Sequence, residues 1–145
     1  MANFKTTLAK TFALAPEIDS LFRASTFDLY SDLCSLPINE QDSDELFLLG
    51  ELQRIMRWLE EAKNRIDYLK RPIKETSHLH KNASGRYETS SGYEYTSGTV
   101  IEVLAGDKYH ETPYWMRSRV EHNGREYYLV GLEDICMDGL PVRRR

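Results

Sequence analysis

The chain has 145 residues, of which 41% are hydrophobic and 29% are charged, a balance that excludes a disordered or fibrous protein. It carries 19 Lys and Arg against 23 Asp and Glu, which gives a net charge of −4. This charge excludes a protein that holds nucleic acid by overall positive charge, so any nucleic-acid contact has to be local.

We expect no secretory signal in the first 19 residues, because Lys5, the Thr6 and Thr7 pair and Lys10 interrupt the apolar residues. No stretch approaches 18 consecutive apolar residues, so no membrane span is predicted. A cytoplasmic location is therefore expected. The two cysteines, Cys34 and Cys136, lack a metal-site or redox spacing, and we expect both to be buried free thiols.

The first predicted helix runs from Pro16 to about Leu36. Its apolar residues recur mainly at three- and four-residue steps: Ile18, Leu21, Phe22, Leu29 and Leu33. Pro16 is suited to the first turn and Pro37 lies beyond the end. Ser25 and Thr26 mark a place where the helix can break, which leaves two shorter helices as the alternative.

The second predicted helix, residues 43–70, has the clearest periodicity in the chain. Two tracks repeat every seven residues and together form an a/d seam: Leu52, Leu59 and Ile66, and Leu48, Ile55, Ala62 and Leu69. A seam of this length needs a partner. The short acidic turn before it favours an antiparallel, coiled-coil-like hairpin with the first helix, and homodimerisation through the same seam is the alternative.

After Pro72 the composition changes, which predicts an α+β protein. Residues 1–72 form the helical hairpin, residues 73–84 a polar connector, and residues 85–145 a small antiparallel β-sheet or an SH3-like barrel. The predicted strands are Arg86–Thr89, Thr99–Leu104, Tyr114–His122, Arg125–Val130 and Leu140–Arg144. Asn123-Gly124 between two strand patterns predicts a two-residue hairpin turn.

That turn pairs Val120 with Tyr127 and Arg119 with Tyr128, and so defines two faces of the hairpin. One face is predicted to be core: Met116, Ser118, Val120, Tyr127 and Leu129. The other is the candidate partner-binding face: Trp115, Arg117, Arg119 and Tyr128, with Val130 beside them. The structural alternative is that Trp115 covers a second small core while the arginine stems pack over Tyr128.

Charge is also distributed unevenly along the chain. The segment from Glu40 to Glu51 holds five acids and no bases, so Asp42, Asp44 and Glu45 are further candidates for contact with a basic partner. Dipole complementarity at a helix N-terminus is the simpler explanation of these acids. We expect Arg143-Arg144-Arg145 to be a solvated basic end.

The sequence contains no recognised catalytic motif, so we expect a protein that is not an enzyme and that has no cofactor. His78 and His80 have the spacing of two metal ligands, but no Cys-x-x-Cys or acidic helix motif accompanies them, and we expect no metal site.

The second half resembles a family of small uncharacterised proteins, domains of unknown function carried by conjugative elements, plasmids and phages of Gram-positive bacteria. The resemblance rests on these segments: Arg71–Ile73, Gly85–Glu88, Tyr95–Gly98, Ile101–Leu104, Trp115, Arg119–His122, Tyr127–Gly131 and Gly139–Arg143. It implies a mobile-element context but brings no catalytic residues with it.

The resemblance implies a non-catalytic binding protein that inhibits a bacterial defence effector, in the manner of an anti-CRISPR protein acting on a Cas9-type nuclease. The alternative is a nucleic-acid-binding accessory or regulatory factor that acts through the β module. The expected partner is therefore a protein, with nucleic acid disfavoured by the net charge.

Overall fold

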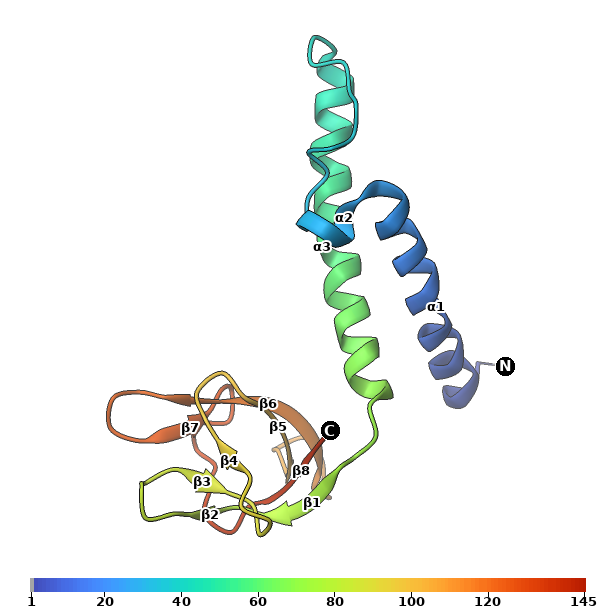
Figure 1. Cartoon of the computed structure of the whole chain (residues 1–145). Helices are drawn as coiled ribbons and strands as arrows, with labels where there is room; N and C mark the ends of the chain where they lie inside the picture. The colour runs from blue at the N-terminus through green and yellow to red at the C-terminus, as the bar shows by residue number, and fades with distance from the viewer. Residues whose placement is uncertain (1) are drawn as a thin grey trace. The chain divides into compact units, whose positions relative to one another are not determined.

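The computed structural model describes residues 2–145, which divide into two compact units, one ending at Arg71 and one starting at Pro72. The first unit is helical and the second is built of antiparallel strands, so the α+β class is confirmed (Figure 1). Each unit has a hydrophobic core of its own.

Helix α1 (Phe4–Ser25) starts well before the predicted first helix. Its N-cap is Asn3, whose side-chain oxygen accepts hydrogen bonds from the amides of Lys5 and Thr6. Pro16 therefore lies inside the helix rather than opening it, and the prediction is wrong at this end. A threonine-rich first turn conceals the start, because it lacks the apolar spacing that identifies an amphipathic helix.

Helix α1 ends at Ser25, the place where Ser25 and Thr26 predicted a possible break. Thr26 has a φ of +58°, in the left-handed region, and the short helix α2 (Phe27–Tyr30) follows it. The alternative of two shorter helices is thus the one observed. Helix α3 (Ser43–Lys70) matches the predicted span of residues 43–70.

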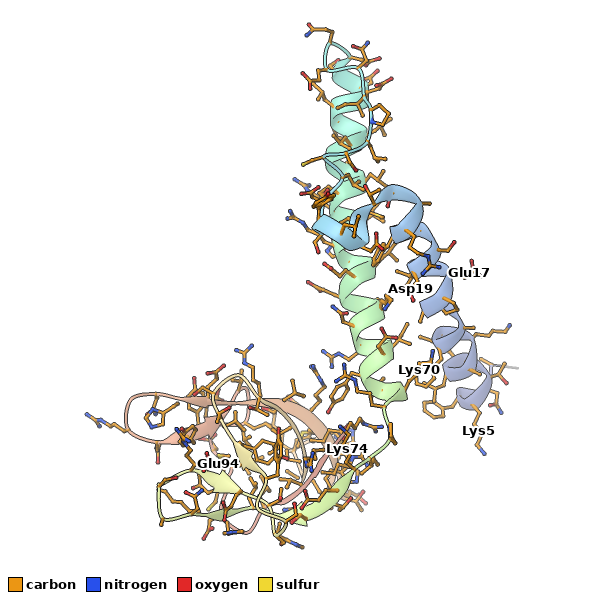
Figure 2. The ribbon with its side chains drawn as sticks, in the orientation of Figure 1. Lys5, Glu17, Asp19, Lys70, Lys74 and Glu94 are labelled. Carbon is orange, nitrogen blue, oxygen red and sulfur yellow. The ribbon has the colours of Figure 1, made fainter. Side chains whose placement is uncertain are left out.

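Helices α1 and α3 run antiparallel in the first unit, which confirms the helical hairpin (Figure 1). Their shared core consists of Ile18, Phe22, Phe27, Leu33 and Met56. At the edge of this core Lys63 of α3 forms ion pairs with Asp67, at 2.5 Å, and with Asp19 of α1, at 3.1 Å. Figure 2 shows Asp19 on α1. The hydrogen bonds that Lys63 donates to Asp67 and, second, to Asp19 raise the pKa of its ammonium group, which therefore stays charged.

The heptad seam of α3 is only partly used by this hairpin. Met56 and Ile66 are buried, whereas the track of Leu48, Ile55 and Leu69 is 62%, 46% and 39% exposed. No helix within residues 2–145 is long and apolar enough to cross a membrane.

The second unit contains two antiparallel sheets. The five-stranded sheet has the order β1-β8-β5-β6-β7 and the three-stranded sheet the order β2-β3-β4. The strands of the first are β1 (Glu75–His78), β5 (Val100–Ala105), β6 (Tyr114–His122), β7 (Tyr127–Leu129) and β8 (Pro141–Arg144). Those of the second are β2 (His80–Lys81), β3 (Tyr87–Glu88) and β4 (Glu94–Tyr95). Both sheets are open across the described residues, so the SH3-like barrel is not formed.

Strand β6 has the predicted span, and the other four predicted strands lie at the predicted places with shifted ends. The segment 73–84, expected as a connector, instead contains β1 and β2. Its polar residues hide the strands, but β1 pairs with β8 over four residues, from Glu75 opposite Arg144 to His78 opposite Pro141. Edge strands need only one neighbour and tolerate such polar sequences.

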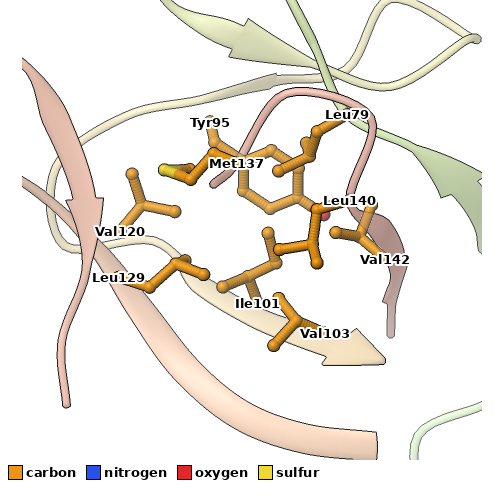
Figure 3. Close-up of a cluster of buried hydrophobic side chains, with 9 residues drawn as sticks. All are labelled: Leu79, Tyr95, Ile101, Val103, Val120, Leu129, Met137, Leu140 and Val142. Carbon is orange, nitrogen blue, oxygen red and sulfur yellow. The ribbon is translucent and has the colours of Figure 1, made fainter. Parts of the chain in front are cut away.

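The core of the β unit lies against one face of the five-stranded sheet and is closed by Tyr95 of β4 and by the segment before β8 (Figure 3). Its buried members are Leu79, Tyr95, Ile101, Val103, Val120, Leu129, Met137, Leu140 and Val142. Both cysteines lie in loops and are exposed, so the prediction of buried thiols is wrong.

The β6–β7 hairpin has a longer loop than predicted. Val120 pairs with Leu129 and His122 with Tyr127, two residues away from the predicted register. The Asn123 side chain accepts hydrogen bonds from the amides of Arg125 and Glu126, and Gly124 has a φ of +94°, which together close a four-residue loop. Because the shift is two residues, each side chain keeps its predicted face.

Candidate functional site

The candidate site is the face of the five-stranded sheet that points away from the core. We call it the arginine face: Glu102, Trp115, Arg117, Arg119, Tyr128, Arg143 and Arg145. Along β6 the exposure alternates, with Ser118 and Val120 buried and Arg117 and Arg119 exposed, as expected for a strand with one face on the core. The four predicted β-unit residues therefore share one surface.

Glu102 is at the centre of this face, and sequence reasoning missed it. It is 4% exposed, and its carboxylate bonds Arg143 at 2.7 Å and Arg145 at 3.1 Å. A carboxylate this deeply buried is stable only when it is paired, so Glu102 fixes both guanidinium groups. The sequence did contain a signal for this residue, because Glu102 is the one charged residue in the otherwise apolar run Ile101–Leu104 of β5.

The three C-terminal arginines are structured rather than solvated, which corrects the expectation of a free basic end. Arg143 and Arg145 bond Glu102, while Arg144 bonds Glu75 at 3.1 Å and stacks 4.2 Å from the centre of the Tyr93 ring. Strand pairing of β8 between β1 and β5 explains the difference, because it orders the backbone that carries these side chains.

Trp115 is held in place by one of these arginines. The Arg143 guanidinium lies 4.4 Å from the centre of the Trp115 ring, a cation–π distance, and the indole is half-buried. Tyr128 of β7 pairs with Glu121 of β6 and lies at the end of the face away from β8. The face thus combines guanidinium groups with an indole ring that one of them holds in place.

A shallow hollow lies beside the exposed arginines. Its volume is about 290 Å³ and it is lined by Val100, Arg117, Ser118, Arg119 and Val130. The Arg119 side chain is 54% exposed and bonds Glu121 at 2.8 Å. An exposed pair of this kind exchanges readily with another anion, because it contributes little stability in water.

The acidic candidates belong to the helical unit, and two of them have structural roles there. The Asp42 side chain is the N-cap of α3 and accepts hydrogen bonds from the amides of Asp44 and Glu45, at 2.9 and 3.3 Å. Glu45 accepts a hydrogen bond from the amide of Asn39, at 2.6 Å. Asp44 is exposed in the first turn, where a negative charge complements the helix dipole.

The cap at Asp42 gives a first testable prediction. Asp42→Ala is expected to lower the free energy of unfolding of the helical unit by about 1 kcal/mol, because two amides lose their acceptor. Asp42→Asn keeps the acceptor without the charge and is expected to be nearly neutral. Urea unfolding followed by circular dichroism at 222 nm measures both; equal losses in the two variants would refute the capping role.

Two further polar clusters lie in the β unit. Hydrogen bonds from the Tyr114 hydroxyl, then from His110 and the Tyr109 amide, lower the pKa of Asp107 to about 2. His80 bonds Glu88 at 2.9 Å. Within residues 2–145 no group of three or more His, Cys, Asp and Glu side chains is arranged to hold a metal ion.

Comparison with known proteins adds one match. Residues 78–144 match the model of a domain of unknown function (DUF5348), which covers the β unit from the end of β1 to the end of β8. No curated protein and no solved structure is significantly similar to the chain.

Proposed function

We propose that this is a non-catalytic binding protein that recognises an acidic surface of a protein partner with its arginine face. The observation that carries the proposal is the position of Trp115, Arg117, Arg119 and Tyr128 on one sheet face. Trp, Tyr and Arg are the residue types that dominate binding hot spots. The buried Glu102 contacts hold part of this surface rigid, which lowers the entropic cost of binding.

The proposed partner is a bacterial defence effector of the Cas9 type, which the protein would inhibit as an anti-CRISPR protein does. This part of the proposal rests on the resemblance of the second half to proteins carried by mobile elements. The channels of such nucleases for RNA and DNA are positively charged, so the arginine face would bind an acidic patch outside them, and an inhibitor that binds there needs no chemistry of its own.

Nucleic-acid binding by the β unit is the second candidate, and the C-terminal arginines favour it. Arg143 and Arg145 place two more guanidinium groups on the face that carries Trp115 and Tyr128, which are able to stack on bases. Against it, residues 72–145 hold ten Lys and Arg and eleven Asp and Glu, a net charge of −1. Contact with phosphate would therefore be confined to this face.

The double variant Arg117→Ala with Arg119→Ala tests the face directly. Each substitution is expected to weaken partner binding by more than about 1 kcal/mol, while thermal stability changes little because both side chains are exposed. A pull-down and a DNA-cleavage assay with purified Cas9-type nuclease measure the effect. Arg125→Ala is the matched control, since it removes an exposed arginine of the same hairpin from the loop.

Three outcomes separate the proposals. Unaffected cleavage at micromolar wild-type protein would reject inhibition of that nuclease. A gel shift with single-stranded DNA that weakens steeply as salt rises would favour the nucleic-acid candidate, and no shift at low salt would reject it. A double variant that melts several degrees lower and binds normally would show that the face is structural.

A further inference from the structure

The long helix α3 has two apolar faces, and the hairpin covers only one of them. Met56 and the half-buried Leu49 and Leu59 pack into the core of the helical unit. The other face carries an exposed stripe, which we call the α3 stripe: Leu48, Leu52, Ile55, Trp58 and Ala62. Leu48, Ile55 and Trp58 in it are 62%, 46% and 66% exposed.

The spacing of the stripe is that of a helix–helix contact. Leu48, Ile55 and Ala62 repeat every seven residues, and Leu52 and Trp58 lie on either side of this line. At 100° per residue the five side chains span about 120° of the helix surface, the width of a face that packs on another helix. A side chain as large as tryptophan is rarely left so exposed beside such an apolar line without a partner.

The charges beside the stripe identify the occupant. Positions 44, 51, 58 and 65 form one flank, with Asp44 and Glu51 towards the start of α3 and Arg65 towards its end. If a second α3 lies antiparallel with Ile55 opposite its own copy, Leu48 meets Ala62 and Asp44 meets Arg65. A parallel, in-register arrangement would leave Asp44 and Arg65 at opposite ends of the helix pair, where they cannot meet.

We propose that two copies of this chain associate through the α3 stripe as an antiparallel, two-fold symmetric dimer, with reciprocal Asp44–Arg65 ion pairs at its ends. The arrangement is self-complementary in both shape and charge, as a two-fold interface requires. The small Ala62 accommodates Leu48 of the other copy. This inference is independent of the proposed function, since it uses no residue of the arginine face.

Sedimentation equilibrium of the full chain, from sub-micromolar to high-micromolar concentration, tests the dimer. The wild type is expected to pass from monomer to dimer over this range. Ile55→Glu places two carboxylates together at the two-fold axis and is expected to raise the dissociation constant roughly tenfold or more. Leu14→Glu is the matched control, because Leu14 is 53% exposed on α1, outside the stripe.

A charge exchange tests the antiparallel direction. Asp44→Arg and Arg65→Asp, each alone, place like charges together at both ends and are expected to weaken the dimer several-fold. Combining the two restores opposite charges and is expected to recover most of the affinity. In a parallel dimer positions 44 and 65 do not meet, so the double variant would show no recovery over the single ones.

Three results would overturn the proposal: a wild type that is monomeric throughout, equal association by Ile55→Glu and Leu14→Glu, or no recovery in the double exchange. Circular dichroism at 222 nm, compared between variants, establishes that each keeps its helices. Ile55 and Leu14 are both exposed helical positions, where glutamate is compatible with the helix.

Discussion

Replacing Glu102 with alanine is expected to lower the free energy of unfolding of the β unit by about 3–5 kcal/mol. The carboxylate is 4% exposed and bonds both Arg143 and Arg145, so its loss leaves two partly buried guanidinium groups without this anion. Arg143 also stacks on the Trp115 ring, so we expect the indole to become more mobile when Arg143 loses its bond to Glu102. Glu102→Gln keeps two polar atoms in place and is expected to lower the free energy of unfolding by less than Glu102→Ala does.

Tryptophan fluorescence during urea unfolding measures this effect in the β unit alone. The chain has two tryptophans, Trp58 in α3 and Trp115 in β6, so a Trp58→Phe background leaves only the reporter beside Arg143. Glu121→Ala in the same background is the control, because it removes the carboxylate of an exposed ion pair, for which we expect less than about 1 kcal/mol. A Glu102→Ala loss no larger than that of the control would contradict the structural role of Glu102.

The second large effect is expected in the helical unit. Phe27→Ala should lower its free energy of unfolding by about 3–5 kcal/mol, because the ring is fully buried and its removal leaves a cavity. Phe27 follows the left-handed Thr26 and packs on Phe22 with the ring centres 4.8 Å apart. The phenylalanine pair therefore joins α2 to α1 at the point where the helix breaks.

Circular dichroism at 222 nm during urea unfolding reports on this unit, since all helices of the described chain belong to it. Phe47→Ala is the matched control. Its side chain is 64% exposed on α3, and we expect a change within about 0.5 kcal/mol. Similar losses in the two variants would mean that Phe27 does not anchor the core.

Helix α3 was predictable because the sequence features that define it lie close together along the chain. Its seven-residue repeats and its acidic cap both lie within the helix or directly before it, and they gave Ser43–Lys70 without reference to the rest of the chain. The N-terminal half of α1 was missed because its residues up to Leu14 are almost entirely exposed and show no buried stripe. Pro16 then suggested a start in the middle of the helix.

The arginine face was predictable only in the part that lies on one hairpin. Alternation along β6 assigns Arg117 and Arg119 to one side whatever the loop length, and Tyr128 of β7 stays on that side because the register differs by an even number of residues. Glu102, Arg143 and Arg145 join the face through pairing between β5 and β8, which are about 40 residues apart in sequence. Contacts over such separations leave no periodic signal in a single sequence.

The position of β8 has a consequence for folding during synthesis. This strand, residues 141–144, is made last among the described elements, yet it lies between β1 and β5 in the five-stranded sheet. The helical hairpin depends on nearby residues and is able to form while the β unit is still emerging from the ribosome. The β unit has to wait for β8, so until then its edge strands stay open and are exposed to pairing with other nascent chains.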